Sequence, residues 1–295
     1  MQLTGEVGPV RTLFSVVRGA PKAAAGFGIL ALIVLIAVLH GPILTLIGLG
    51  HAGNSEFGLR TPSPAPAWIA FLGPGRIELA ELVLGLWNSL RIGIEAGLLS
   101  TAIGLAAAFY ASYRGGVVDS ILSTTTDLFL VIPAFPLLAV FAAYGSGTTV
   151  NAIAIVMAVF GWAVVARPIR SHVLSLRTRG FVDLARVSKA STAEIILTEL
   201  LPNMLPFIAM GCAQAIMTAL LAVIGLDVFG LGPADAPDLG SLVYRAIQGG
   251  ALTLGDWQAV FVPMATIVLL FFSLGLIALG LEERFNPRLQ KMVGR

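Results

Sequence analysis

The apolar residues of this chain fall in blocks of about 20, the length that a helix needs to cross the ~30 Å hydrocarbon core of a bilayer. Only 12% of the residues are charged, whereas a soluble domain carries about 25%. Such a chain cannot present a water-facing surface throughout. Backbone polar groups in lipid must be satisfied inside the protein, and a helix does this within one segment. The sequence therefore predicts an all-α polytopic membrane protein.

Six transmembrane helices are predicted, at residues 23–39, 89–112, 121–143, 150–165, 204–224 and 259–281. With the N-terminus placed in the cytoplasm, most of the 18 basic residues fall in cytoplasmic segments, as the positive-inside rule requires. An even number of spans then puts both termini on that side. We expect a multi-pass protein of the cell (inner/plasma) membrane, with an uncleaved first span rather than a signal peptide.

This topology divides the chain into three regions. Residues 1–87 hold a cytoplasmic tail, the first span and an external loop with a short interfacial helix near residues 77–86. Residues 88–281 form a five-helix core, and residues 282–295 form a cytoplasmic tail. The second external loop, 227–257, carries four aspartates and is expected to cap the outer mouth of the spans. These carboxylates are either solvated or attract a cationic surface.

The cytoplasmic loop between the fourth and fifth spans, residues 166–203, is a polar island in an apolar sequence. The arginines between residues 167 and 179 suit the headgroups of the inner leaflet. Gly180 breaks the chain, and residues 181–189 are predicted to be helical. Because this helix mixes apolar and charged residues, it either rests on the bilayer as an amphipathic segment or docks on a soluble partner.

A second short helix is predicted over residues 192–201 of the same loop. Ser191 suits its N-cap, and Glu194 stands three residues later, where a capping box needs a Glu or Gln. Pro202 is expected to end the helix. The resulting helix-turn-helix favours the docking interpretation, since two short capped helices of mixed charge differ from a membrane-surface helix with one wide apolar face.

A few polar residues lie inside the predicted spans. A carboxylate at the centre of the bilayer is costly, so Glu95 and Asp127 should face protein or water. Each either makes an interhelical hydrogen bond or lines a pore, and Pro133 and Pro136 are expected to kink the third span. Gln214 and Thr218 serve helix packing or contact a substrate. The candidate residues of a translocation pathway are Asp127, Pro133, Gln214 and Thr218.

Several function classes find no support in the residues. The chain has no HExxH, GxSxG or P-loop pattern, its three histidines are scattered and Cys212 has no ligand-like neighbours. We therefore expect neither an enzyme nor a metal site. A net charge of +2 does not suggest nucleic acid. A secondary transporter or channel remains the alternative to a pore driven by a separate ATPase, but internal repeats and clustered acids, which favour it, are not seen.

The cytoplasmic loop resembles the characteristic loop of permease subunits from bacterial and archaeal ATP-binding cassette importers. The family pattern is Glu-Ala-Ala, then Gly, then Leu-Pro. Asp183-Leu184-Ala185 takes the place of Glu-Ala-Ala, Lys189 stands where Gly is usual, and Leu201-Pro202 closes the motif. Gly75-Arg76 resembles a further element, with Ile77 where Asp is usual. Other landmarks occur in order at residues 88–93, 115–119, 127–133, 161–162, 173–177, 230–233 and 286–289.

These landmarks are similar to those of the second permease subunit of dipeptide and oligopeptide importers. The resemblance implies that residues 88–281 are a transport core, forming half of a heterodimeric pore with a second homologous permease. It also implies two cytoplasmic ATPases, which hold ATP and Mg on their own chains, and an external substrate-binding protein. Peptides rank ahead of oligosaccharides as substrates. The residues implied to couple to the ATPases are Phe181, Asp183, Leu184, Ala185, Arg186, Lys189, Ala190, Ser191, Glu194 and Pro202.

Overall fold

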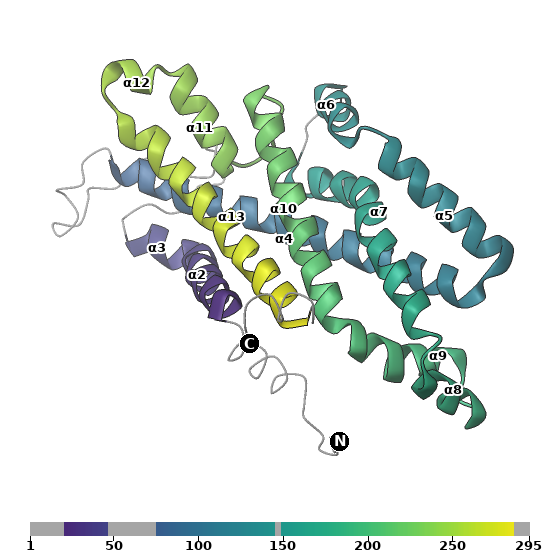
Figure 1. The fold of residues 1–295 in the computed structure, drawn as a ribbon. Helices are drawn as coiled ribbons and strands as arrows, with labels where there is room; N and C mark the ends of the chain where they lie inside the picture. Colours follow the sequence, from purple (N-terminus) through teal and green to yellow (C-terminus); the bar gives the residue numbers. More distant parts are fainter. Residues whose placement is uncertain (1–20, 47–74, 145–148, 286–295) are drawn as a thin grey trace.

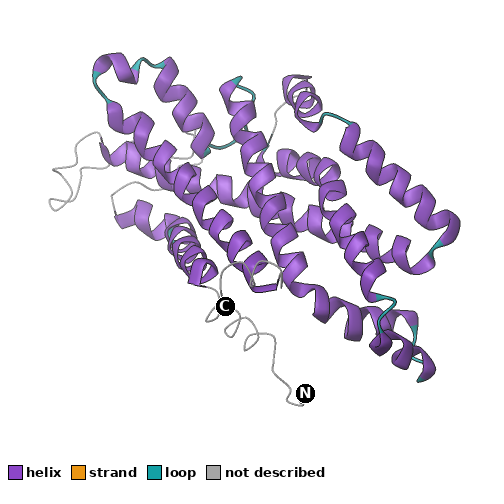
Figure 2. Ribbon diagram, in the orientation of Figure 1, coloured by secondary structure: helices purple, strands orange, loops and turns teal. Residues whose placement is uncertain are grey.

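The computed structural model describes residues 21–46, 75–144 and 149–285, without the side chains of residues 75–77, 186, 193, 284 and 285. Most of both predicted tails, most of the first external loop and the 286–289 landmark lie outside this part, as do the side chains of Arg76 and Ile77. The described residues form helices and connecting turns, and none forms a strand (Figure 2). The predicted all-α class is confirmed.

The helices are labelled in chain order in Figure 1. They are α2 (Pro21–Val38), α3 (His40–Leu46), α4 (Gly75–Arg114), α5 (Gly116–Val131), α6 (Ala134–Tyr144), α7 (Val150–Leu176), α8 (Gly180–Val187), α9 (Thr192–Glu194), the π-helix η2 (Ile195–Leu200), α10 (Leu201–Val228), α11 (Leu239–Gln248), α12 (Ala251–Leu254) and α13 (Trp257–Phe285).

The long helix α4 is the centre of the molecule, and α7 and α10 pack along it (Figure 1). Small residues let these helices approach closely, as is usual where lipid supplies no hydrophobic drive between helices. A Cβ atom on Gly97 would lie 2.4 Å from Ile216 of α10, and one on Gly104 would lie 2.8 Å from the Trp162 carbonyl oxygen of α7. On the other flank, α2 packs against α13, and Lys22 forms an ion pair with Glu283.

The predicted number of spans agrees with the structure. Five helices are long and apolar enough to cross a membrane, and α5 and α6 together make a sixth if the bent pair is one span. The two are bent by 71°, and the break falls at Ile132 and Pro133, as predicted for Pro133. Ile132 has extended backbone angles (φ −65°, ψ 123°), which a residue before proline favours. Pro136 lies in the first turn of α6 rather than at the break.

Two predicted boundaries are wrong because helices run on past them. The interfacial helix at 77–86 and the span at 89–112 are one continuous helix of 40 residues, α4. Its Gly85 does not break it, because that glycine fits closely against Leu242 and the Asp238 backbone. Likewise α7 does not end at residue 165 but continues through Pro168 to Leu176.

The predicted end of a helix at Pro202 is also wrong. The chain stays helical from Thr192 through η2 into α10, and Pro202 occupies the first turn of α10. Pro202 directly follows the π-helical turn of η2, in which the Leu201 amide donates to the Ile196 carbonyl oxygen. Pro206, one turn later, also lies inside α10. The second short helix predicted for the 166–203 loop is therefore continuous with α10.

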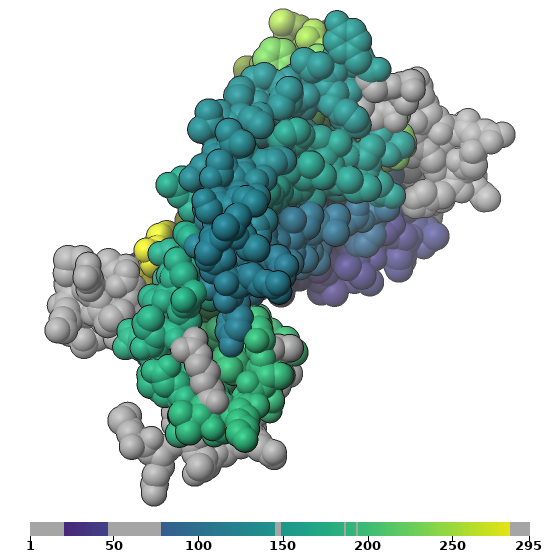
Figure 3. Space-filling model, turned by 90° about the vertical axis from the view of Figure 1, so that its right-hand side faces the viewer, coloured from purple at the N-terminus to yellow at the C-terminus, as the bar shows by residue number. Residues whose placement is uncertain are grey.

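The molecule has two distinct ends (Figure 1). One is formed by α8, α9 and η2, which protrude from the body in the space-filling view (Figure 3). The other carries α11 and α12, which occupy much of the region predicted as the second external loop. Two of the four aspartates of that region, Asp227 and Asp238, are buried, so the prediction that these carboxylates are solvated or attract a cationic surface is wrong for them.

Candidate functional site

The helix α8 has one buried side and one exposed side. Val182 is fully buried and belongs to a core cluster with Val173 of α7 and Met204 of α10. Leu184 and Val187 are 69% and 80% exposed, and Asp183 beside them is also exposed. The buried side fixes α8 to the ends of two long helices. The exposed side presents apolar residues next to a carboxylate at the protruding end of the molecule.

The turn after α8 depends on an unusual backbone at Lys189. This residue has φ 60°, and it is the only residue other than glycine with positive φ in the described part of the chain. The Ala190 amide then donates to the Ala185 carbonyl oxygen (3.1 Å), which closes the helix. Left-handed backbone favours glycine at the end of a helix, so the structure explains why a Gly-containing pattern fits this position and why Lys189 is strained there.

The predicted capping box is confirmed. The Ser191 hydroxyl accepts from the Glu194 amide (3.2 Å), and the Glu194 carboxylate accepts from the Ser191 amide (3.3 Å). Ile195 and Leu200 of η2 then pack into the same buried cluster as Val182. The helix-turn-helix is thus joined to α10 without an intervening loop. Phe181, Ala185 and Ala190 are half-buried on the inner side of this unit, whereas Pro202 is exposed.

Arginines of the 166–203 loop connect neighbouring helices. Arg170 of α7 makes two hydrogen bonds to the Asp119 carboxylate of α5, of 2.7 and 2.6 Å. Arg177 donates to the Ser112 carbonyl oxygen near the end of α4. The prediction that these arginines serve lipid headgroups is therefore wrong for Arg170 and Arg177. Sequence reasoning missed both contacts, because their partners are more than 50 residues away in the chain.

The four predicted pathway residues lie at three places: Asp127 on α5, Pro133 between α5 and α6, and Gln214 and Thr218 on α10. Asp127 of α5 pairs with Arg167 of α7 at 3.3 Å, an exposed ion pair between helices. Pro133 marks the α5–α6 break. Gln214 and Thr218 are exposed on one face of α10, where the Thr218 hydroxyl donates to the Gln214 carbonyl oxygen (2.9 Å). The structure does not bring the four together into one site.

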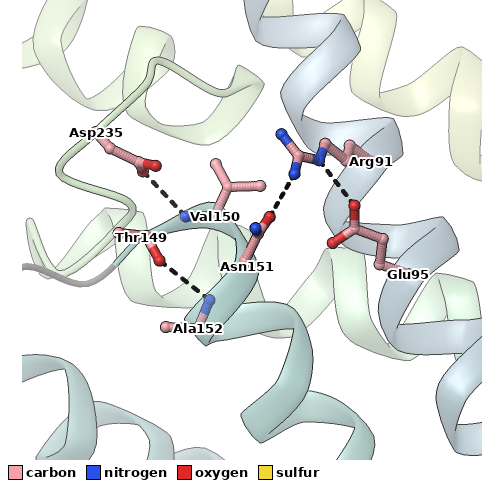
Figure 4. A network of polar contacts seen from close by, with 7 residues as sticks. All are labelled: Arg91, Glu95, Thr149, Val150, Asn151, Ala152 and Asp235. Carbon is pink, nitrogen blue, oxygen red and sulfur yellow. Dashed lines mark hydrogen bonds and ion pairs between the residues drawn. The ribbon is translucent and has the colours of Figure 1, made fainter.

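A polar network links helices near the opposite end, where α7 begins (Figure 4). Arg91 of α4 donates to Glu95 one turn along (2.7 Å) and to the Asn151 side-chain oxygen of α7 (2.6 Å). Glu95 is therefore held within its own helix, and Arg91 makes the contact between helices. Asp235 accepts from the Val150 amide (2.9 Å), which fixes the α10–α11 connection to the start of α7.

Comparison with known proteins gives a consistent set of relatives. Residues 100–291 match the family described as binding-protein-dependent transport system inner membrane component. The chain is 29% identical over 280 residues to the oligopeptide transport system permease protein OppC of Mycobacterium tuberculosis, with 94% of each chain covered. It is 30% identical over 277 residues to a putative peptide permease protein of Brucella ovis, covering 92% of this chain and 89% of that one.

A third relative is the dipeptide transport system permease protein DppC of Bacillus subtilis, 28% identical over 270 residues, with 91% of this chain and 82% of that one covered. Among solved structures, the fold is similar to a chain of the MetNI methionine ABC transporter in an inward-facing conformation. The TM-score is 0.54 at 20% identity, covering 69% of this chain and 97% of that one. At that identity the likeness concerns the fold alone.

Proposed function

The chain belongs to the family of binding-protein-dependent transport system inner membrane components and is a multi-pass permease subunit of an ABC importer, and from this premise we propose that it forms half of a heterodimeric pore for peptides. The named relatives, permeases for oligopeptides, dipeptides and putative peptides, support peptides over oligosaccharides. A second homologous permease completes the pore, and an external binding protein delivers the substrate.

The ATPases dock on the exposed side of α8 in this proposal. The observation that carries it is the pair of exposed apolar side chains, Leu184 and Val187, beside the exposed Asp183 on α8. A helix that rests on the bilayer buries a wide apolar face in the lipid. In α8, by contrast, Val182 is buried in the protein core. The remaining mixture of apolar and acidic residues suits a cleft on a soluble partner.

The docking segment, which comprises α8, α9 and η2, can transmit movement to α10. The capping box and the continuous path through η2 leave no break between α9 and α10. The short turn between α8 and α9 is closed by the hydrogen bond from the Ala190 amide to the Ala185 carbonyl oxygen. Arg177 and Arg170 fasten the same region to α4 and α5. When the ATPases close, α8 therefore moves together with the ends of these helices, as in rigid-body switching. ATP and Mg belong to the ATPases in this arrangement.

The direction of transport gives each end of the molecule its side of the membrane. The α8–α9 end and both termini are cytoplasmic, as the distribution of basic residues indicates. The α11–α12 end is external and receives the binding protein. The polar network of Arg91, Glu95 and Asn151 then lies toward the external side, and the exposed face of α10 with Gln214 and Thr218 faces the pathway.

The docking assignment is tested by charge substitutions on α8. Leu184→Glu and Asp183→Lys should abolish peptide-stimulated ATP hydrolysis and uptake in proteoliposomes, because both place an unfavourable charge in the ATPase cleft. Membrane insertion should be unaffected, since both side chains are exposed. Val117→Glu is the matched control, a similarly exposed apolar residue at the first turn of α5. Wild-type uptake and hydrolysis in both α8 variants would refute the assignment.

A further inference from the structure

Two aspartates at the α11 end are completely enclosed. Asp227, in the last turn of α10, is 1% exposed, and Asp238, the N-cap of α11, is 0% exposed. Both carboxyl groups lie at the start of α11, because Asp227 packs against Gly240, two residues after Asp238. One oxygen of Asp238 accepts from the Ser241 amide (2.8 Å). Its other oxygen, and both oxygens of Asp227, have no donor among the described residues.

Two ionised carboxylates cannot occupy such a site together. Each would lose its hydration, and the like charges would repel each other. Opposite charge nearby is limited. The charged neighbour of Asp238 apart from Asp227 is Arg245 of α11, which also lies 3.7 Å from Glu81 of α4. One of the two carboxyl groups must therefore be neutralised by something that fits between them.

The space around Asp227 is closed by backbone rather than by side chains. A Cβ atom on Gly232 would lie 1.8 Å from one Asp227 oxygen, and one on Gly240 would lie 2.2 Å from the other. Hard cations take about six or more oxygen ligands. Among the described residues no group of three His, Cys, Asp or Glu side chains could hold a metal ion. A proton does not need such a set of ligands and can be held between the two carboxyl groups.

We propose that Asp227 and Asp238 bind one proton between them, and that this proton clasps the α10–α11 connection onto the end of α10. One carboxyl group keeps its O–H and donates it to the carboxylate of the other, so the pair carries a single negative charge. The aspartic-protease pair shares a proton for the same electrostatic reason. The clasp needs nothing from the transport role and stands apart from it.

The clasp closes a connection that is fastened to several helices. The Asn88 side-chain amide of α4 donates to the Pro237 carbonyl oxygen (2.7 Å), and the Leu239 amide donates to the Ser89 hydroxyl (3.0 Å). Asp235 accepts from the Val150 amide of α7. Loss of the proton would push Asp227 and Asp238 apart and release this connection from α10, α4 and α7 together.

The sign of the pH dependence follows from the buried carboxyl group. Burial raises the pKa of Asp238 above its ordinary value, against the opposing hydrogen bonds from Ser241 and the charge of Arg245. The closed state therefore holds a proton at pH values where an open, hydrated pair has lost it. The relevant pH window runs from the ordinary pKa of an aspartate up to the raised pKa of Asp238. As pH rises through this window, the equilibrium constant for closure falls by about tenfold per pH unit.

The test measures opening of the connection in the assembled complex. Ala236→Cys, in a Cys212→Ala background, places a half-buried thiol in the connection. Its rate of alkylation is measured against pH and divided by the rate of the same chain carrying Asp227→Asn, so that the pH dependence of the thiol itself cancels. Asparagine donates to the Asp238 carboxylate without a proton to lose. The ratio should rise about tenfold per pH unit across the window.

Asp256→Asn is the matched control, because Asp256 is an exposed aspartate on the same side and leaves the pair intact; it should preserve the slope. A flat ratio would overturn the proposal. So would a saturable slowing of alkylation by Na⁺ or Ca²⁺ at fixed pH, which would make the occupant a metal cation. Infrared spectra of the unsubstituted complex give a reading that needs no variant. A protonated-carboxyl C=O band at neutral pH is expected, and its absence would contradict the shared proton.

Discussion

Lys189 has a backbone conformation that is unfavourable for a residue with a side chain. Its left-handed backbone (φ 60°) closes the turn between α8 and α9, yet its Cβ atom makes that conformation costly by roughly 1–2 kcal/mol. The structure therefore gives a backbone reason for the glycine that the family pattern carries here. The lysine side chain points away from the core and is exposed, so it does not repay the strain by burial.

Lys189→Gly should therefore stabilise the turn. The expected gain in the free energy of unfolding is about 0.5–1 kcal/mol, because relief of the left-handed strain exceeds the entropy that glycine loses on folding. Thermal unfolding of the purified complex measures it. Lys189→Ala keeps the Cβ atom and removes the charge, so it should show no gain. An equal gain in both variants would assign the effect to charge rather than to backbone.

Features of single residues that depend on their sequence neighbours could be predicted, whereas features that depend on tertiary contacts could not. The Ser191 and Glu194 capping box follows from spacing in the sequence alone, and it is present. The burial of Asp227 and Asp238 is set by Gly232 and Gly240 and by the packing of α11, none of which has a local pattern. The same holds for Arg170, whose partner Asp119 lies on another helix.

At the scale of elements, the capping box is what starts the path from the turn into α10. Ser191→Ala removes the acceptor of the Glu194 amide and should cost about 1 kcal/mol. The loss should be confined to faster hydrogen exchange of the amides of residues 194–200. Thr192→Ala, one residue on and also exposed, is the control and should leave exchange unchanged. Equal protection in both variants would show that the packing of Ile195 and Leu200 alone sets this end.

Hydropathy predicts that the long helices exist, but not where they end. The length of the apolar blocks predicts the spans, and Pro133 predicts the break in the third span. The 40-residue length of α4 and the continuous path through Pro202 were not predicted. Pro202 has the sequence signal of a helix end, yet the chain stays helical through it because the π-helical turn of η2 precedes it directly.

At the scale of the whole molecule, the long helix α10 connects the two ends. The docking segment and the α11 connection are joined by α10, which packs on α4 along its length (Figure 1). Residues such as Leu221 and Val228 of α10 remain exposed on this single chain. In the proposed heterodimer, this face of α10, with Gln214 and Thr218, would lie toward the second permease.

The most direct measurement is the composition of the complex that contains this chain. The tagged protein is expressed in its native host, extracted in mild detergent, and its bound proteins are identified by mass spectrometry. A second permease and one or two ATPases with P-loop motifs should be recovered, and Leu184→Glu should retain the permease while losing the ATPases. Recovery of the wild-type chain alone, in a detergent that keeps comparable complexes intact, would contradict the proposed half-pore and indicate a self-sufficient transporter or channel.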